Sequence, residues 1–167
     1  PLQQIVMRVY LTFDIEIWCD GWNDLDRKFP KAFERYVYGR SDQGDYALPK
    51  TLDILGRHGL SGVFFVEPLF STRFGHEHLA TIVSLIQERG QSVQLHLHPE
   101  WCDEVRPPLI AGLAAKQPSL SGLTLEQQVT LVRLGLDLLR EAGAHPIHAF
   151  RAGSYAANAN TLEALAK

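Results

Sequence analysis

The segment Gln94-Leu-His-Leu-His-Pro-Glu-Trp101 joins a short apolar run to two histidines. Val93 to Leu97 has the pattern of a buried strand, and His96 and His98 stand at its end. Side chains at positions i and i+2 of a strand point to the same face, so the two imidazoles project together. Pro99 then stops the ladder because it has no N–H to donate. Neutral imidazoles suit Zn²⁺ and related divalent ions, so the segment indicates a metal site at a strand end.

Strand and helix patterns alternate along the rest of the chain. This alternation, with continuous apolar strands, favours a parallel α/β sheet or barrel. By contrast, Trp18 to Tyr46 predicts a long loop with a short helix near Lys31 to Tyr38. The expected strands cover residues 5–13, 62–66, 93–97 and 147–150, and the expected helices begin near Pro49, Glu77, Thr124 and Asn160 or Thr161.

The helix after Thr124 has the clearest signals of its type. Thr124 suits the N-cap position, Gln127 completes a capping box, and Gly143 ends the helix. An apolar stripe at helical spacing predicts its buried face, which would comprise Leu125, Val129, Val132, Leu136 and Leu139.

The number of βα units is small for a closed barrel. About four strands are expected, whereas a closed barrel of this kind needs roughly seven or eight. We therefore expect residues 1–167 to be the N-terminal part of a single, distorted (β/α)-barrel domain, truncated after about four units. Its apolar strand edges would be covered by further residues or by a partner in a homo-oligomer.

Composition excludes several classes of protein. The 167 residues are enough for one domain, and their net charge of -3 gives no basic footprint for nucleic acid. No apolar run approaches the ~20 residues that span a bilayer. The first residues lack the features of a signal peptide, which favours a cytoplasmic location. Cys19 and Cys102 are expected to be free thiols.

Polar residues follow three of the expected strands. Asp14 and Glu16 end the first strand, His96 and His98 the third, and Arg151 to Tyr155 the fourth. The carboxyl ends of parallel strands share one edge, where ligands bind. Two histidines with one carboxylate leave an open metal position for water, whose pKa then falls towards ~7. A second carboxylate can accept the water's proton, so the sequence predicts a metal-dependent hydrolase of an amide or ester.

The remaining residues suggest supporting roles. A buried Arg151 would keep the carboxylate base ionised and oriented. The turn at Gly153-Ser-Tyr155 can offer backbone N–H groups to an oxyanion. Trp18 and Trp101 follow the motifs and could stack on sugar rings, although simple packing is an equal alternative.

Three motifs together resemble the polysaccharide deacetylases, the NodB-homology enzymes of carbohydrate esterase family 4, in a divergent WalW-like type. They are Thr12-Phe-Asp-Ile-Glu16, His96-Leu-His-Pro99 with Trp101, and Phe150-Arg-Ala-Gly-Ser-Tyr155. The resemblance spans the chain, with the motifs in the family's order. It implies a distorted (β/α) barrel that removes N-acetyl, or sometimes O-acetyl, groups from a glycan or glycolipid with Zn²⁺ or another divalent transition metal.

The resemblance also assigns roles to individual residues. It makes Asp14 the catalytic base, His96 and His98 metal ligands, Arg151 the partner of Asp14, and the Tyr155 N–H part of an oxyanion hole. The family usually has two adjacent aspartates, the second a ligand, but Ile15 occupies that position here. We therefore expect Glu16 to be the ligand, with Asp14 as the alternative. The family's histidines are four apart rather than two, and its general-acid histidine would lie beyond Lys167.

Two other functions fit parts of the pattern. One is another barrel metallohydrolase, of the amidohydrolase or PHP-phosphoesterase type, although there the His-x-His pair normally ends the first strand. The other is a non-catalytic glycan-binding domain that keeps the fold. Metal content distinguishes the enzymes from the binding domain, and release of acetate or phosphate distinguishes the two enzymes.

Overall fold

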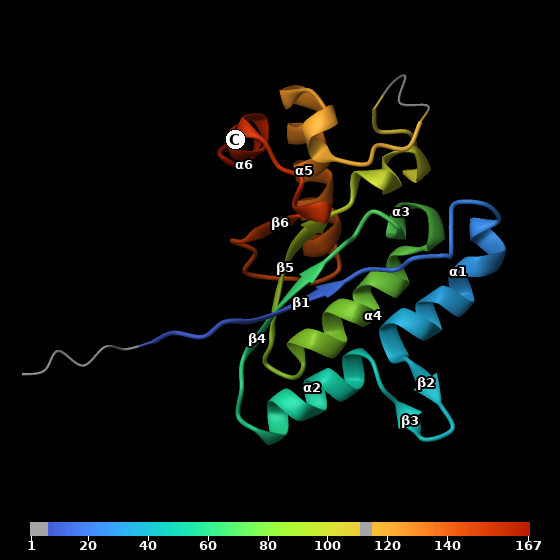
Figure 1. The fold of residues 1–167 in the computed structure, drawn as a ribbon, viewed down its shortest axis with the longest axis vertical. Coiled ribbons are helices and arrows are strands. Elements are labelled where there is room, and N and C mark those ends of the chain that lie inside the picture. Colours follow the sequence, from blue (N-terminus) through green and yellow to red (C-terminus); the bar gives the residue numbers. More distant parts are fainter. Residues whose placement is uncertain (1–6, 111–114) are drawn as a thin grey trace, which may run out of the picture.

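The computed structural model describes residues 7–110 and 115–167 of the chain. Its main sheet is parallel and has the strand order β1-β4-β5-β6. The strands of this sheet therefore lie side by side in the order in which they occur along the chain. Figure 1 shows these strands forming a curled half-barrel. Their bounds are β1 (Leu11–Ile15), β4 (Gly62–Val66), β5 (Ser92–Leu97) and β6 (Phe150–Ala152).

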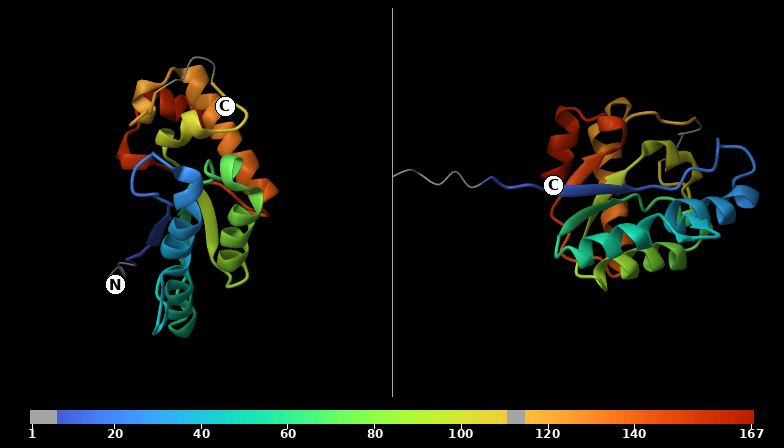
Figure 2. Two further views of the ribbon diagram at one scale, coloured as in Figure 1. Left: turned by 90° about the vertical axis from the view of Figure 1, so that its right-hand side faces the viewer. Right: turned by 60° about the horizontal axis from the view of Figure 1, so that its bottom comes forward.

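Helices cover one face of this sheet. In Figure 1, α1, α2 and α4 lie together on one side of the strands, while α5 packs on β5 and α6 packs on α5; Figure 2 shows this arrangement in two other views. No helix within the described ranges is both long and apolar enough to cross a membrane. The helices are α1 (Leu25–Phe33), α2 (Leu48–Arg57), α3 (Ser71–Phe74), α4 (His76–Gln87), α5 (Leu125–Glu141) and α6 (Ala159–Leu165), with short turns η1 (Glu34–Tyr38), η2 (Pro99–Glu104), η3 (Leu120–Gly122) and η4 (Gly153–Tyr155).

The register divides the sheet into two faces. Asp14 pairs with Phe65, Phe65 with Gln94, and His96 with Arg151, so these five residues share one face. We call it the polar face. The alternate residues point to the helices and form the core, and those on β4 and β5 are almost fully buried: Phe64, Val66, Val93, Leu95 and Leu97.

The region from Trp18 to Tyr46 is more regular than its sequence predicts. It contains α1, the π-helical turn η1 and a hairpin of β2 (Arg40–Ser41) and β3 (Gly44–Asp45). The helix begins at Leu25 rather than near Lys31, because Leu25, Phe29 and Phe33 share one buried stripe. The helix expected near Lys31 to Tyr38 is present as the end of α1 and η1, but the expectation that the rest is an irregular loop was wrong.

The first strand is shorter than predicted. Residues 5 and 6 lie outside the described part, and residues 7–10 are not in the sheet. The pairing with β4 begins at Leu11 and Gly62, so the earlier residues have no neighbouring strand with which to form a ladder.

The last strand begins at Phe150 and not at Ile147 as predicted. The Gln94 side chain explains the difference, because its Oε1 accepts the backbone N–H groups of His148 (2.8 Å) and Ala149 (2.7 Å). These two donors are therefore satisfied by a side chain and not by a ladder. The shift places Arg151 in the strand, directly beside His96.

The buried face of α5 is also rotated from the prediction. Thr124 and Gln127 form the expected capping box, and Val132 and Leu139 are buried as predicted. The other buried residues are Gln128, Leu131 and Gly135. A Cβ on Gly135 would lie 2.9 Å from Leu95 Cδ1, so this glycine lets the helix approach β5 closely. Close backbone approach, rather than the apolar stripe, decides which face is buried.

Candidate metal centre

Three side chains converge beyond the carboxyl ends of β1 and β5. Glu16 Oε1 lies 2.9 Å from His96 Nε2 and 3.2 Å from His98 Nε2. Among the described residues these three form the cluster of potential metal donors, with their atoms within 4.8 Å of one another. Both imidazoles are buried, while the Glu16 side chain keeps 24% of its exposure. The structure therefore brings together the three ligands expected from the sequence.

The orientation of His96 is set by the neighbouring strand. Its Nδ1 lies 2.8 Å from the Arg151 backbone oxygen. A carbonyl oxygen only accepts, so Nδ1 carries the hydrogen and donates it. In the neutral imidazole the lone pair is then on Nε2, which faces Glu16.

His98 is arranged in the same way by a carboxylate that the sequence reasoning missed. Its Nδ1 lies 3.2 Å from Glu100 Oε2, and its Nε2 faces Glu16. Burial by itself would lower the pKa of His98, but the carboxylates of Glu100 and Glu16 overcome this effect and raise it to about 10. In the absence of a metal, His98 is therefore an imidazolium that supplies the positive charge between the carboxylates.

Glu16 is held in its ionised form. Burial alone would raise its pKa, but its contacts with the imidazoles of His96 and His98 and the hydrogen bond from Trp18 lower it well below the usual range. Trp18 Nε1 donates to Glu16 Oε2 at 2.6 Å, which leaves Oε1 for the two histidines. The Trp18 ring also stands edge-on to His98, with 4.9 Å between ring centroids.

Asp14 lies in a different environment although it is only two residues from Glu16. The Arg151 guanidinium makes an ion pair with Asp14 and donates to Thr12 Oγ1 at 2.9 Å. It also lies over the Phe65 ring, 4.1 Å from its centroid. The same Arg151 therefore orients Asp14 with its side chain and His96 with its backbone oxygen.

The turn after β6 has an unusual backbone. Ser154 and Tyr155 have positive φ values of 52° and 54°. Non-glycine residues seldom adopt this conformation, and it is concentrated at functional sites. The Tyr155 side chain is 88% exposed, so the proposed role of this residue rests on its backbone. Gly153 packs on His98, because a Cβ there would lie 2.7 Å from Nδ1.

Glu67 is a second acidic residue that the sequence reasoning missed. It follows β4 directly, and its backbone N–H donates to the Ile15 oxygen at 3.0 Å, which continues the β1–β4 ladder. The residue is 1% exposed, and its Oε2 has no hydrogen-bond partner in the described structure. Burial raises the pKa of Glu67 to about 8. Its place at a strand end, two residues after Phe65 on the polar face, was a signal that could have identified it.

Trp101 does not have the position expected of a sugar-stacking residue. It is 2% exposed and packs edge-on against Trp22 and Phe74. Because both faces are enclosed, the stacking role predicted for Trp101 is wrong for this structure. Trp18 remains partly exposed beside the histidines.

The donor set fits a divalent ion. Ligands around a tetrahedral ion at about 2.0–2.1 Å lie roughly 3.3 Å apart, close to the two separations measured here. Each histidine also has a second partner on Nδ1, as histidine ligands in metalloproteins almost always do. The nearby unpaired oxygen of Glu67 adds an acidic group that a cation would stabilise. Glu16, His96 and His98 are therefore chemically suited to hold a metal.

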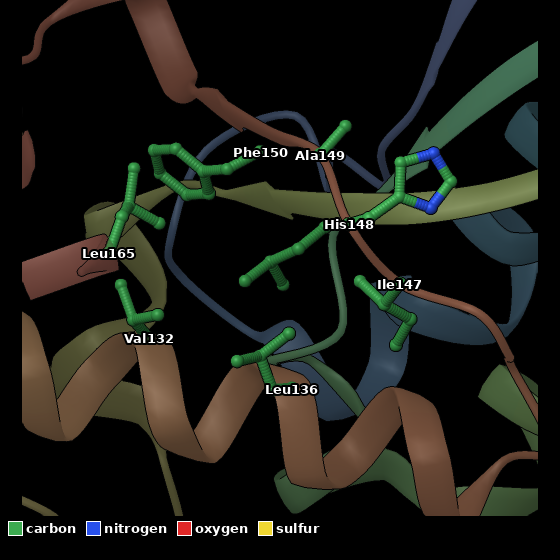
Figure 3. Close-up of a pocket in the computed structure, with 8 residues that line it drawn as sticks. Val132, Leu136, Ile147, His148, Ala149, Phe150 and Leu165 are labelled. Carbon is green, nitrogen blue, oxygen red and sulfur yellow. The ribbon is translucent and has the colours of Figure 1, made fainter. Parts of the chain in front are cut away.

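An apolar cavity of about 300 Å³ lies elsewhere, between α5, the end of α6 and the segment before β6. Figure 3 shows Val132 and Leu136 pointing from α5 towards Phe150, Leu165 and Ile147. None of the three metal donors lines this cavity, so it is separate from the candidate centre.

Comparisons with known proteins bear on the fold. No protein-family model and no curated protein sequence matches this chain. Among solved structures, the chain is similar to BA3943 from Bacillus anthracis, described as a CE4 family pseudoenzyme, with 14% identity and a TM-score of 0.54. A BA3943 mutant, described as a CE4 family pseudoenzyme with restored enzymatic activity, gives 15% identity and the same TM-score of 0.54.

At this identity the similarity defines the fold alone. The match covers 93% of this chain but 38% of BA3943. The chain therefore has a NodB/CE4-like fold, a curled parallel half-barrel with helices outside, which confirms the predicted fold class. The aligned part is less than half of the neighbour's length.

Proposed function

We propose that this chain provides the metal-binding part of a hydrolase that removes N-acetyl or O-acetyl groups from a glycan. The observation that carries the proposal is the meeting of three potential metal donors, Glu16 Oε1 and the two Nε2 atoms of His96 and His98. Because His96 Nδ1 donates to the Arg151 oxygen, the lone pair on its Nε2 faces Glu16 Oε1, and such a pair needs a proton or a metal ion between the two atoms. The NodB/CE4-like fold supports the choice of an acetyl substrate.

Different residues of the chain would bind the metal ion and accept the proton. Glu16, His96 and His98 would hold the ion, with Zn²⁺ expected from two imidazoles and a carboxylate. When bound, such an ion polarises an acyl carbonyl and lowers the pKa of a nearby water molecule. Asp14 would accept the proton of that water at its carboxylate.

Positioning residues would support this chemistry. Arg151 pairs with Asp14 and holds its carboxylate in place on the polar face. The backbone N–H of Tyr155, in its positive-φ turn, would donate to the developing oxyanion. Trp18 would contact the sugar beside the ligands.

The WalW-like type and a cytoplasmic location also stay predictions.

A second candidate is a glycan-binding domain without catalysis. The similar B. anthracis protein is described as a pseudoenzyme, and this chain has Ile15 between its two acidic residues. In this case the acidic and imidazole groups would form an ion-pair network around the imidazolium of His98.

The test is the metal content of protein purified without chelator, followed by acetate release from N-acetylated glycans. We expect about one divalent ion per chain, lost in a His96→Ala/His98→Ala variant. A His58→Ala/His145→Ala variant is the matched control, because it removes two exposed imidazoles away from the centre. A wild-type protein that takes up no ion contradicts the hydrolase, whereas acetate release that is lost together with the ion contradicts the binding domain.

A further inference from the structure

A cationic pocket lies beside the candidate metal centre. It has a volume of about 220 Å³ and opens between α1 and the segment that follows β1. We propose that this pocket binds an anionic substituent, a carboxylate or a phosphate, on the glycan whose acetyl group reaches the metal centre. This proposal rests on the proposed function. Four basic side chains from one region of α1 and η1 line the pocket: Arg27, Lys28, Lys31 and Arg35.

Nearby carboxylates offset only part of this positive charge. Asp20, which itself lines the pocket, lies 3.5 Å from Arg35, and Asp24 lies 3.2 Å from Arg27. Lys31 is exposed and also lines the pocket. The concentration of positive charge is unexpected in a chain whose net charge is -3, so the pocket is electrostatically suited to an anion.

The charge pattern is also unfavourable for the helix that carries it. Arg27, Lys31 and Arg35 are spaced four residues apart, and like charges at this spacing destabilise a helix. Arg27 and Lys28 also lie in the first turns of α1, next to the positive end of the helix dipole. A bound anion would reduce both unfavourable interactions. Anion binding therefore explains why these cations are placed together, whereas helix stability does not.

Trp18 connects the pocket to the metal centre. Its side chain lines the pocket, while its Nε1 donates to Glu16 Oε2 at 2.6 Å and its ring contacts His98 edge-on. An anionic group in the pocket would therefore lie across one indole ring from the metal ligands. This separation suits a charged substituent and an acetyl group on the same sugar or on adjacent sugars.

The pocket is fixed by contacts on both sides. Lys28 Nζ donates to the Asp20 backbone oxygen at 3.0 Å, which ties α1 to the segment after β1. Ala32 and Cys19 form a buried floor between these segments. The backbone that presents the cationic groups is therefore packed, while the side chains of Arg27 and Arg35 remain largely exposed.

The experiment measures binding in metal-free protein, so that a probe cannot bind through a metal ion. Dissociation constants would be determined by NMR titration for N-acetylglucosamine, N-acetylmuramic acid and N-acetylglucosamine 6-phosphate. These probes are neutral, carboxylated and phosphorylated versions of one sugar. We expect at least one charged probe to bind about tenfold more tightly than the neutral sugar at low salt, with the advantage falling as salt screens it.

Variants assign the preference to the pocket. Lys31→Glu, and Arg27→Gln/Lys31→Gln if charge reversal prevents folding, should remove the advantage of the charged probe. Arg133→Glu makes the same charge change on the exposed side of α5 and should retain it. A comparison of the two charged probes distinguishes a carboxylate site from a phosphate site.

Two outcomes would overturn the proposal. One is equal binding of charged and neutral sugars to the wild type, including no detectable binding of either. The other is a preference that survives in both pocket variants. Metal uptake is measured separately, so a protein that binds the charged sugar but no metal would contradict the proposed function and not the pocket.

Discussion

Asp14 and Glu16 end the same strand and carry the same charge, yet they have opposite surroundings. Asp14 has a guanidinium partner in Arg151, whereas Glu16 faces two imidazole nitrogens. The first carboxylate is already neutralised by a fixed cation. The negative charge of the second carboxylate, Glu16, is neutralised only when a proton or a metal ion lies between it and the imidazoles.

The difference shows how one strand end can separate two functions. The charge that satisfies Glu16 is exchangeable, which is the property of a metal ligand. Asp14 is instead paired with a guanidinium, which holds this proton acceptor in a fixed orientation. Arg151 connects the two carboxylate environments, because its backbone oxygen accepts the Nδ1 hydrogen of His96.

The largest expected effect comes from exchanging each carboxylate for its amide. Glu16→Gln should weaken Zn²⁺ binding by more than about 100-fold, since it removes a charged ligand. Asp14→Asn should change Zn²⁺ affinity by less than about threefold but reduce acetate release by roughly 10²–10⁴-fold. Competition titration with a chelating dye measures the affinities. Equal loss of affinity in both variants would show that Asp14 is also a ligand.

A smaller effect is expected from the outer carboxylate. Glu100→Gln leaves an acceptor for His98 Nδ1 but removes the charge, so we expect Zn²⁺ affinity to fall by about 10–100-fold. The matched control is Glu88→Gln at an exposed position. Unchanged affinity in Glu100→Gln would mean that this carboxylate does not support the ligand.

The buried Glu67 predicts a pH-dependent stability of the metal-free protein. Because folding raises the pKa of Glu67 from 4.5 to about 8, its contribution to stability is fully present below pH 4.5. That contribution is lost as the pH rises through 8. Glu67→Gln should avoid the loss and exceed the wild type by about 1–3 kcal/mol near pH 8.

Urea unfolding between pH 5 and pH 8 measures this difference. The gap between Glu67→Gln and wild type should widen as the pH rises, while Glu88→Gln should follow the wild type. A gap that is independent of pH would show that Glu67 does not bind its proton more tightly in the folded protein.

The smallest expected effect is steric. Gly153→Ala would place a Cβ 2.7 Å from His98 Nδ1, so the ring must move. We expect Zn²⁺ affinity to fall by about three- to tenfold, with little change at the Asp14–Arg151 pair. Gly122→Ala is the control, because its new Cβ would meet only Gln117 Oε1, at an ordinary 3.6 Å. Equal affinities in the two variants would mean that His98 has room to adjust.

Local signals predicted much of the fold but not its irregular parts. The strand at 62–66 and the capping box at Thr124 and Gln127 were predicted correctly, because short apolar runs and caps act over a few residues. The start of β6 was missed because Gln94, more than fifty residues away, occupies the donors of His148 and Ala149.

The sequence by itself determined the order of strands and helices and the gathering of acidic and imidazole groups at one edge, since strand ends are recognisable locally and parallel strands share an edge. Only the tertiary structure decided that Glu16 faces the histidines while Asp14 faces Arg151, and that Glu67 is buried within electrostatic reach of Glu16 and His98. The physical reason is register. Glu16 and His96 are 80 residues apart, and their meeting depends on the alignment of β1, β4 and β5, which no short segment specifies.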